Sequence, residues 1–374
     1  MRVAHIVGSL EARYGGPSRS VRHLASATAE LGHEVDILTS APSAVPIETR
    51  GTLNVRTWQR GWPGALCRVP EMAGHLRGTK YDVVHHHGLW LRTLHYARRN
   101  AVHYGIPLVV SPRGMASSWA WRQHRTRKML AARCVHPGAF DAVTGWHATS
   151  PEEEQEIRKL GFTQPVCVAP NGVEAPDENN TDAARDFWQK RVPSSTTNPV
   201  ALFYSRFHPK KRVIELIDLW VAISPPNWIL LLVGVPEQFS VAQLRGYVVR
   251  AGAVGRIEVY DGTSQPPPYA VASLFLLPSH NENFGLVVAE ASAHGVPVVV
   301  TDTTPWRTLQ REGMGWCVPW NEYESSLRRA LNEPPSELRA RGAQARAWVL
   351  REFSWNKSAE LLADFYPRLK GAAR

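Results

Sequence analysis

Short apolar runs alternate with stretches of helical pattern along almost the whole chain. Such alternation is typical of a parallel β-sheet whose two faces are covered by helices. In the first half, the runs predict strands at Val3–Val7, Val35–Leu38, Val83–His86, Leu108–Val110, Ala142–Ala148 and Val166–Val168. In the second half, they predict strands at Val200–Tyr204, Ile229–Val233, Ile257–Tyr260, Ser273–Leu277 and Val298–Val300. The sequence therefore predicts an α/β fold with two Rossmann-like, doubly wound sheets.

The length of the chain also favours two domains, because 374 residues exceed what one hydrophobic core usually supports. A polar stretch from Glu174 to Asn198 has the composition of a connection between domains. We expect a first domain over residues 1–172 and a second over residues 173–352. Two such domains facing each other leave a cleft at the carboxyl ends of their strands, where open parallel sheets bind ligands. The active site is therefore expected between the domains.

One helix start is especially clear in the first half. Ser150-Pro-Glu-Glu153 supplies a serine cap, a proline at the first helical position and a glutamate three residues after the cap. Gly161 is expected to end that helix.

The net charge of +10 and the pI near 9.7 are unevenly distributed. No acid occurs between Asp82 and Asp141, whereas that span holds nine cations and three tryptophans: Arg92, Arg98, Arg99, Arg113, Arg122, Arg125, Arg127, Lys128, Arg133, Trp90, Trp119 and Trp121. Cations interleaved with tryptophans suit an anionic membrane surface. A solvated basic face is the alternative reading. No nucleic-acid partner is expected, because no recognition motif accompanies the charge.

Cysteine spacing and hydropathy indicate the cellular compartment of the protein. The four cysteines are isolated, so the sequence predicts a reduced, cytoplasmic setting without a metal or redox pair. No signal peptide is evident at the first residues, and no apolar run approaches the 18 residues of a membrane helix. We expect a cytoplasmic protein, with the inner membrane face as a candidate peripheral location.

The segment Pro278–Thr301 carries the strongest chemical signal. An apolar strand leads into a loop with one carboxylate, Glu282, and then into a helix with a second, Glu290. The N–H groups at the start of that helix have no partner within it and attract phosphate; the donor-binding residues expected there are Asn283, Phe284, Gly285, Leu286 and Val287. A carboxylate would repel the same phosphate, so the two acids make sense as ligands of hydroxyls on either side of it. The pattern predicts a nucleotide sugar donor.

This segment resembles the Glu-x7-Glu signature of the retaining GT-B glycosyltransferases of family 4, the group 1 glycosyltransferases, within the frame Pro-Ser-x-x-Glu-x-Phe-Gly-x-x-x-x-Glu-Ala. The resemblance implies a hexosyltransferase that transfers a sugar to a hydroxyl acceptor. Ser111–Met115, His147–Ser150, Pro170–Glu174 and Pro305-Trp306 match the same family. Phe353-Ser-Trp355 matches the start of its last helix, which implies that residues 353–374 cross back onto the acceptor-side first domain.

Three further motifs match the family at functional positions. In Gly8–Pro17, Gly15 and Gly16 match a loop that approaches the donor diphosphate, although Gly-Gly-Pro alone is also an ordinary turn. In His85-His86-His87-Gly88, the second histidine of the family pattern, His87, is implied to face the donor sugar. Arg206 and Lys211 match the cation pair that stabilises charge on the leaving diphosphate. Cations are otherwise disfavoured at the start of a helix, so an anion is expected there.

No Asp-x-Asp occurs, so we expect a metal-independent reaction with no cofactor other than the donor substrate. No carboxylate is clearly placed to form a covalent intermediate. A front-face route is therefore expected, in which the leaving phosphate helps remove the acceptor proton. A glycan or lipid-linked glycan of bacterial surface polysaccharide synthesis is the expected acceptor. A nucleotide-sugar epimerase and a non-catalytic membrane scaffold of the same fold are the alternatives.

Two departures from the family pattern concern the donor site. The segment from Gly262 to Pro278 is short and rich in proline, and Thr303 stands where related chains often have glycine. Both leave the nucleotide base and the local donor geometry open.

Overall fold

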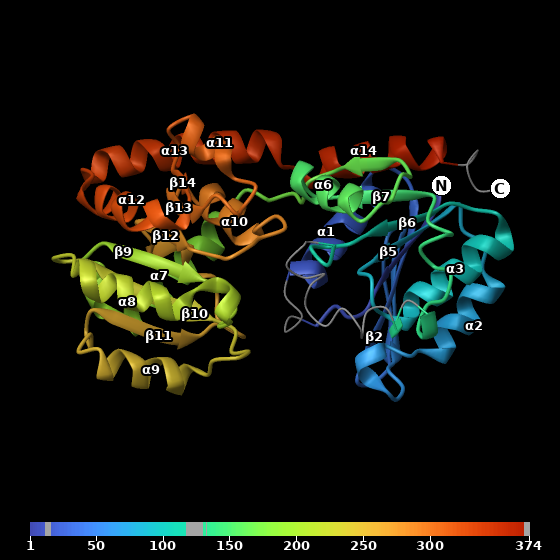
Figure 1. Ribbon diagram of the computed structural model, residues 1–374, viewed down its shortest axis with the longest axis horizontal. Coiled ribbons are helices and arrows are strands. Elements are labelled where there is room, and N and C mark those ends of the chain that lie inside the picture. The colour runs from blue at the N-terminus through green and yellow to red at the C-terminus, as the bar shows by residue number, and fades with distance from the viewer. Residues whose placement is uncertain (12–15, 117–129, 132, 370–374) are drawn as a thin grey trace. The chain divides into compact units, whose positions relative to one another are not determined.

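The computed structural model describes residues 1–11, 16–116, 130–131 and 133–369, and its chain divides into two compact units. The first unit comprises Met1–Gly172 and Phe353–Arg374, and the second comprises Val173–Glu352. Each unit contains a parallel sheet with helices packed on it, so the predicted α/β class with two Rossmann-like sheets is confirmed (Figure 1).

The first unit is built on an eight-stranded sheet with the order β3-β4-β2-β1-β5-β6-β7-β8. Its strands are β1 (Arg2–Val7), β2 (Glu34–Ala41), β3 (Val45–Arg50), β4 (Leu53–Gln59), β5 (Val83–His87), β6 (Leu108–Ser111), β7 (Gly145–Ala148) and β8 (Val166–Val168). All neighbours pair in parallel except β3 and β4, which pair antiparallel. The helices are α1 (Gly16–Glu30), η2 (Gly64–Leu66), α2 (Pro70–Gly78), α3 (Arg92–Tyr104), α6 (Pro151–Lys159) and α14 (Trp355–Arg368).

Helices cover both faces of this sheet because side chains alternate along each strand. Val3 and Val83 face α1 and α14, and they share a buried cluster with Leu362. Ala4 and Val84 point the other way and share a cluster with residues of α2 and α3. Figure 1 shows α14, at the red end of the chain, beside α1. The last helix therefore completes the core of the unit formed by the start of the chain.

The second unit is built on a six-stranded parallel sheet with the order β11-β10-β9-β12-β13-β14. Its strands are β9 (Val200–Tyr204), β10 (Ile229–Gly234), β11 (Ile257–Asp261), β12 (Leu274–Leu277), β13 (Val298–Thr301) and β14 (Trp316–Val318). Its helices are α7 (Glu178–Arg191), η3 (Pro193–Thr196), η4 (Pro209–Lys211), α8 (Val213–Ile223), α9 (Val241–Arg250), η5 (Pro268–Val271), α10 (Leu286–Ala293), α11 (Arg307–Arg311), α12 (Trp320–Asn332) and α13 (Pro335–Glu352). The central strands β9, β10, β12 and β13 are buried almost throughout, which explains their continuous apolar runs.

The structure departs from the sequence prediction at five places. Strands β3, β4 and β14 were not predicted, and β7 begins at Gly145 rather than at Ala142. The stretch expected to be a connection contains helix α7. Asp177 caps that helix by accepting from the N–H of Asn180, and the buried Trp188 anchors it by donating from Nε1 to the carbonyl of Pro266. One buried tryptophan thus holds a helix whose other residues are mostly polar.

Within the described residues, no helix is long and apolar enough to span a membrane.

Candidate active site

The segment between β12 and α10 takes a sharp turn at Gly285. This residue has a φ of 74° and lies directly before the first helical residue, Leu286. No side chain in the described part of the chain caps α10, so its first N–H groups point forward without a capping oxygen. The side chain of Phe284 is buried against Trp306, and its carbonyl accepts from Trp306 Nε1 at 2.6 Å. Phe284 therefore anchors the turn.

Glu282 is held through only one of its two carboxylate oxygens. Lys211 Nζ and Ser279 Oγ both donate to Oε1, the latter at 2.6 Å. Within the described residues, no group donates to Oε2. The side chains of Lys211 and Glu282 are 8% and 10% exposed, so this is a nearly buried ion pair. Burial alone would raise the pKa of the Glu282 carboxyl, but the ammonium groups of Lys211 and Lys210 hold that pKa below its usual range.

The two predicted cations have different environments. Lys211 ends η4 and is buried with Glu282, whereas the side chain of Arg206 is 41% exposed and forms an ion pair with Glu237 at 3.0 Å. An exposed ion pair contributes little to stability, so a stronger anion can displace Glu237 from Arg206. In this structure, Glu237 and Glu282 thus take the place of the anion that was expected beside Arg206 and Lys211.

Thr303 ties the Glu282 loop to the end of β13. Its hydroxyl donates to the carbonyl of Ser279 at 2.8 Å, and its own carbonyl accepts from the N–H of Glu282 at 3.2 Å. Thr301 donates to the same Ser279 carbonyl at 2.6 Å. Thr303 therefore fixes the loop at both ends, which is a role that glycine has no side chain to supply.

Glu290 lies on α10 and is 9% exposed. Its Oε2 accepts from the hydroxyl of Tyr269 at 2.7 Å, and Tyr269 belongs to η5 in the proline-rich segment. The second acid of the Glu-x7-Glu pair is therefore oriented by the segment that departs from the family pattern.

In the first unit, His87 lies at the end of β5 with both ring nitrogens engaged. Arg113 donates to Nδ1, with its Nη2 at 3.2 Å, and also donates to Asn171 Oδ1 at 2.7 Å. Because a guanidinium can only donate, Nδ1 of His87 is an acceptor and the ring proton lies on Nε2. Nε2 lies 3.1 Å from His5 Nδ1, so His87 donates to His5. The ring is thus locked in one tautomer.

A second hydrogen-bonded chain runs through the same face of the sheet. His147 Nε2 donates to the carbonyl of Ala169 at 2.8 Å, so its Nδ1 accepts from His85 Nε2 at 3.3 Å. His85 Nδ1 then accepts from the hydroxyl of Tyr366 on α14 at 2.8 Å. Burial, followed by the charge of Arg113, lowers the pKa of His5 to about 3. Burial also lowers the pKa of His147 to about 3, and the pKa values of His85 and His87 fall well below the ordinary range.

His5, His85 and His87 offer ring nitrogens within 4.8 Å of one another, which is a spacing compatible with a metal ion. The alternate histidines do converge, as their strand positions require. The hydrogen bonds account for both nitrogens of His85 and His87, and the adjacent Arg113 cation disfavours a second cation. The geometry therefore fits neutral, hydrogen-bonded rings better than metal ligands.

Arg113 and Asn171 were not predicted as site residues. Arg113 lies two residues after β6, the neighbour of β5, and Asn171 lies three residues after β8 in the same sheet; this position after a parallel strand is the signal that identifies them. Arg113 has a φ of 53°, which is rare for a residue other than glycine. Glu153 stabilises this turn, since its Oε1 accepts from the N–H of Gly114 at 2.7 Å. The predicted serine cap of α6, Ser150, accepts from the N–H of the same glutamate.

The remaining predictions in the first unit have mixed outcomes. Gly16 is the exposed first residue of α1, and Gly15 lies outside the described residues. Of the basic, tryptophan-bearing span, Trp119, Trp121, Arg122, Arg125, Arg127 and Lys128 lie outside the described residues. Of the described members, Arg113 contacts His87, and the half-buried Trp90 packs against Phe140.

Comparisons with known proteins agree with this architecture. A family model described as Glycosyltransferase Family 4 matches residues 14–175, and one described as Glycosyl transferases group 1 matches residues 184–348. The chain belongs to these GT-B glycosyltransferases.

Among family relatives, a GDP-mannose:cellobiosyl-diphosphopolyprenol alpha-mannosyltransferase of Xanthomonas campestris is 24% identical, over 100% of this chain and 98% of the relative. Two solved structures share the fold at 19% identity. Sucrose-phosphate synthase from Thermosynechococcus elongatus has a TM-score of 0.77 and 100% coverage of both chains. HepE of Anabaena in complex with UDP and glucose has a TM-score of 0.75, with coverage of 98% of this chain and 100% of that chain. This glycosyltransferase thus matches its relatives over nearly its whole length.

Proposed function

We propose that this glycosyltransferase transfers a hexose from a nucleoside diphosphate sugar to a hydroxyl of a lipid-linked glycan, with retention of anomeric configuration. The free Oε2 of Glu282 is the observation that carries the proposal. Lys211 and Ser279 orient the carboxylate through Oε1, so Oε2 is placed to accept from a sugar hydroxyl. The uncapped start of α10, a few residues away in the sequence, supplies N–H donors for the diphosphate.

Positive charge in the second unit supports departure of a nucleoside diphosphate. Arg206 exchanges Glu237 for a diphosphate oxygen, and Lys211 keeps the neighbouring carboxylate charge balanced. Such preplaced charges stabilise the anion that develops as the glycosidic bond breaks. The proposed reaction therefore requires no metal ion, and the leaving phosphate takes part in removing the acceptor proton.

Glu290 and His87 have orienting roles in this proposal. Tyr269 fixes one oxygen of Glu290, and the carboxylate holds the ribose hydroxyls. Because its ring nitrogens bind Arg113 and His5, His87 contributes through its fixed ring position rather than as a base. The nearby guanidinium of Arg113 adds a cation that sequence reasoning did not assign.

Two observations support the proposed acceptor. The Xanthomonas relative is named for a diphosphopolyprenol acceptor. The basic residues of α3 are suited to bind an anionic partner. We place that partner at the cytoplasmic face of a membrane. This acceptor assigns the protein to bacterial surface polysaccharide synthesis.

Donor turnover tests the proposed function. Wild-type protein, Glu282→Ala and Arg206→Ala are incubated with UDP-, GDP- and ADP-sugars, and released nucleoside diphosphate is measured with and without acceptor. We expect one donor to be turned over and both variants to lose at least tenfold in rate. A nucleotide-sugar epimerase would convert the donor without acceptor and without release of nucleotide. A scaffold would show no turnover in any of the three proteins.

A further inference from the structure

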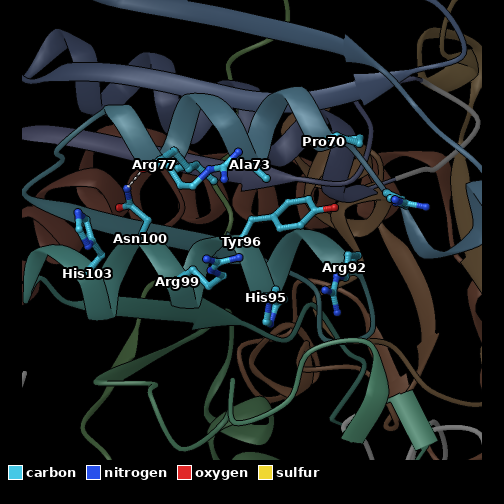
Figure 2. Close-up of a pocket in the computed structure, with 11 residues that line it drawn as sticks. Pro70, Ala73, Arg77, Arg92, His95, Tyr96, Arg99, Asn100 and His103 are labelled. Atoms are coloured by element: carbon cyan, nitrogen blue, oxygen red, sulfur yellow. Dashed lines mark hydrogen bonds between the residues drawn. The ribbon is translucent and has the colours of Figure 1, made fainter.

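A groove of about 560 Å³ on the first unit lies between helices α2 and α3. Figure 2 shows the two helices side by side, with Pro70 and Arg92 toward one end and Arg77 and His103 toward the other. Four arginines and two histidines line it: Arg68, Arg77, Arg92, Arg99, His95 and His103. Ala73, Leu76 and Tyr96 supply an apolar surface between them. The groove therefore combines guanidinium groups with an apolar lining.

The basic residues of α3 occupy one face by their spacing. Arg92, His95, Arg99 and His103 follow at intervals of three and four residues, which places them on one side of the helix. No Asp or Glu occurs in α3 to balance them. Of these four residues, Arg92 and Arg99 carry the fixed positive charges, two turns apart on this face. The face therefore presents positive charge that an anionic ligand would balance.

The arginines of the groove are not neutralised by protein carboxylates. Among the described residues, no Asp or Glu oxygen lies within 4.0 Å of the guanidinium groups of Arg68, Arg77 or Arg99, and the same holds for Arg92. Arg92 is instead fixed by donating to the carbonyls of Cys134 and Val135. Burial, followed by the charges of Arg92 and Arg99, lowers the pKa of His95 to about 4. The wall of the groove thus retains a net positive charge.

Two buried polar atoms also have no hydrogen-bond partner among the residues that the structure describes. Asn100 lines the groove, is 2% exposed and donates from Nδ2 to the carbonyls of Leu76 and Thr79. Its Oδ1 is buried with no donor in the described structure, and so is Nδ1 of His95. Buried polar groups are normally hydrogen-bonded, so these two atoms mark a part of the groove wall whose hydrogen bonding is incomplete.

We propose that this groove binds the diphosphate of a prenyl diphosphate-linked glycan acceptor. The assignment rests on the proposed function, of which it specifies the acceptor. Arg77 and Arg99 come from opposite walls and hold the diphosphate oxygens, since guanidinium binds phosphate through paired N–H groups. The apolar residues contact the first part of the prenyl chain. A solvated basic face would require neither paired walls nor an apolar lining.

Binding of farnesyl diphosphate by calorimetry tests the assignment on the full chain. We compare wild type, the double variant Arg77→Gln/Arg99→Gln, and the charge-matched control Lys80→Gln/Lys159→Gln, which alters exposed cations outside the groove. The groove variant should bind at least tenfold more weakly, and the control should stay within twofold of wild type. Farnesol should not bind. Equal affinity of the groove variant and wild type would overturn the proposal.

Two comparison ligands test whether a different anionic ligand accounts for binding in the groove. Inorganic pyrophosphate should bind wild type at least tenfold more weakly than farnesyl diphosphate; equal binding would remove the prenyl chain from the assignment and overturn it. Phosphatidylglycerol vesicles should not discriminate between the two double variants. If only vesicle binding depended on Arg77 and Arg99, the groove would be a membrane contact instead. Donor turnover by wild type is measured separately, so its absence with retained farnesyl diphosphate binding would reject the proposed function alone.

Discussion

Tyr269 donates from its hydroxyl to Oε2 of Glu290 at 2.7 Å, which joins a proline-rich turn to helix α10. Tyr269 is 2% exposed and Glu290 is 9% exposed, so water competes little for this bond. The short segment before β12 therefore has a structural function. It replaces a helix with a single buried tyrosine that fixes the orientation of Glu290.

Replacement of Tyr269 with phenylalanine tests that relationship. The variant leaves Glu290 without one buried donor, so we expect a stability loss of about 1–3 kcal/mol and weaker donor binding. Urea unfolding gives the first quantity, and the thermal shift produced by the preferred nucleotide sugar gives the second. Tyr247→Phe is the matched control, because its hydroxyl binds Asp218 in an exposed position. An unchanged ligand-induced shift in Tyr269→Phe would separate Tyr269 from donor binding.

The buried pair of Lys211 and Glu282 should be strongly coupled. Removal of one partner leaves an uncompensated buried charge, which costs about 3–5 kcal/mol. The free energies of unfolding lost in Lys211→Met and in Glu282→Gln should therefore add up to more than the free energy lost in the double variant. Urea unfolding of wild type, both single variants and the double variant measures this coupling. Additive effects would mean that the pair does not share a buried ion-pair interaction. The exposed pair Arg206 and Glu237 should show a coupling of only about 0–1 kcal/mol.

Acid should destabilise the first unit in a range set by its histidines. The folded-state pKa of His5, His86 and His147 is lowered to about 3 by burial, whereas the unfolded value is 6.5. The unfolded chain therefore binds more protons below pH 6.5, and stability falls by about 1.4 kcal/mol per pH unit for each histidine. The loss continues toward pH 3.

Denaturation at pH 7.5, 6.0 and 5.0 measures this dependence. His147→Gln keeps a donor for the carbonyl of Ala169 and should reduce the slope by about one histidine equivalent. A pH-independent stability in this range would contradict the buried neutral state of the rings.

Arg113→Lys should impair sugar transfer by releasing His87. The lysine ammonium cannot reproduce a fork that reaches both His87 Nδ1 and Asn171 Oδ1, and hydrogen bonds to charged groups are worth about 1.5–3 kcal/mol. We expect at least a tenfold lower kcat. Imidazole nitrogen NMR should show loss of the single His87 tautomer. Arg50→Lys, an exposed control, should preserve both properties. Full activity with a disordered tautomer would show that Arg113 acts on His87 without consequence for transfer.

The sequence predicted the strands whose residues are apolar throughout. β9, β10 and β12 lie in the buried middle of their sheet and give uninterrupted runs. β3 escaped prediction because it is a largely exposed edge strand with the sequence Val-Pro-Ile-Glu-Thr-Arg. β14 also escaped prediction, although it has three residues like β8, which was predicted. Helix α7 was missed because its stability comes from one distant contact of Trp188 rather than from its own composition.

The predicted site residues were found by motif, and their partners were not. Nothing in the spacing of Lys211 and Glu282 reveals that they form an ion pair, since the contact joins loops 71 residues apart. The link between Arg113 and His87 likewise depends on the adjacency of β5 and β6. Strand order and side-chain orientation are tertiary properties, and they decide which atoms of a predicted residue remain available to a ligand.

The placement of α14 has a consequence for biosynthesis. The cluster that contains Val3, Leu24 and Val83 is covered by Ala359, Leu362 and Tyr366, which the ribosome makes only after the whole of the second unit. Residues 173–352 are continuous and can complete their own core while the preceding segment still exposes one apolar face. The nascent chain must keep that face from aggregating until α14 has left the ribosome, and a shortened chain that ends before Phe353 would carry the exposed surface permanently.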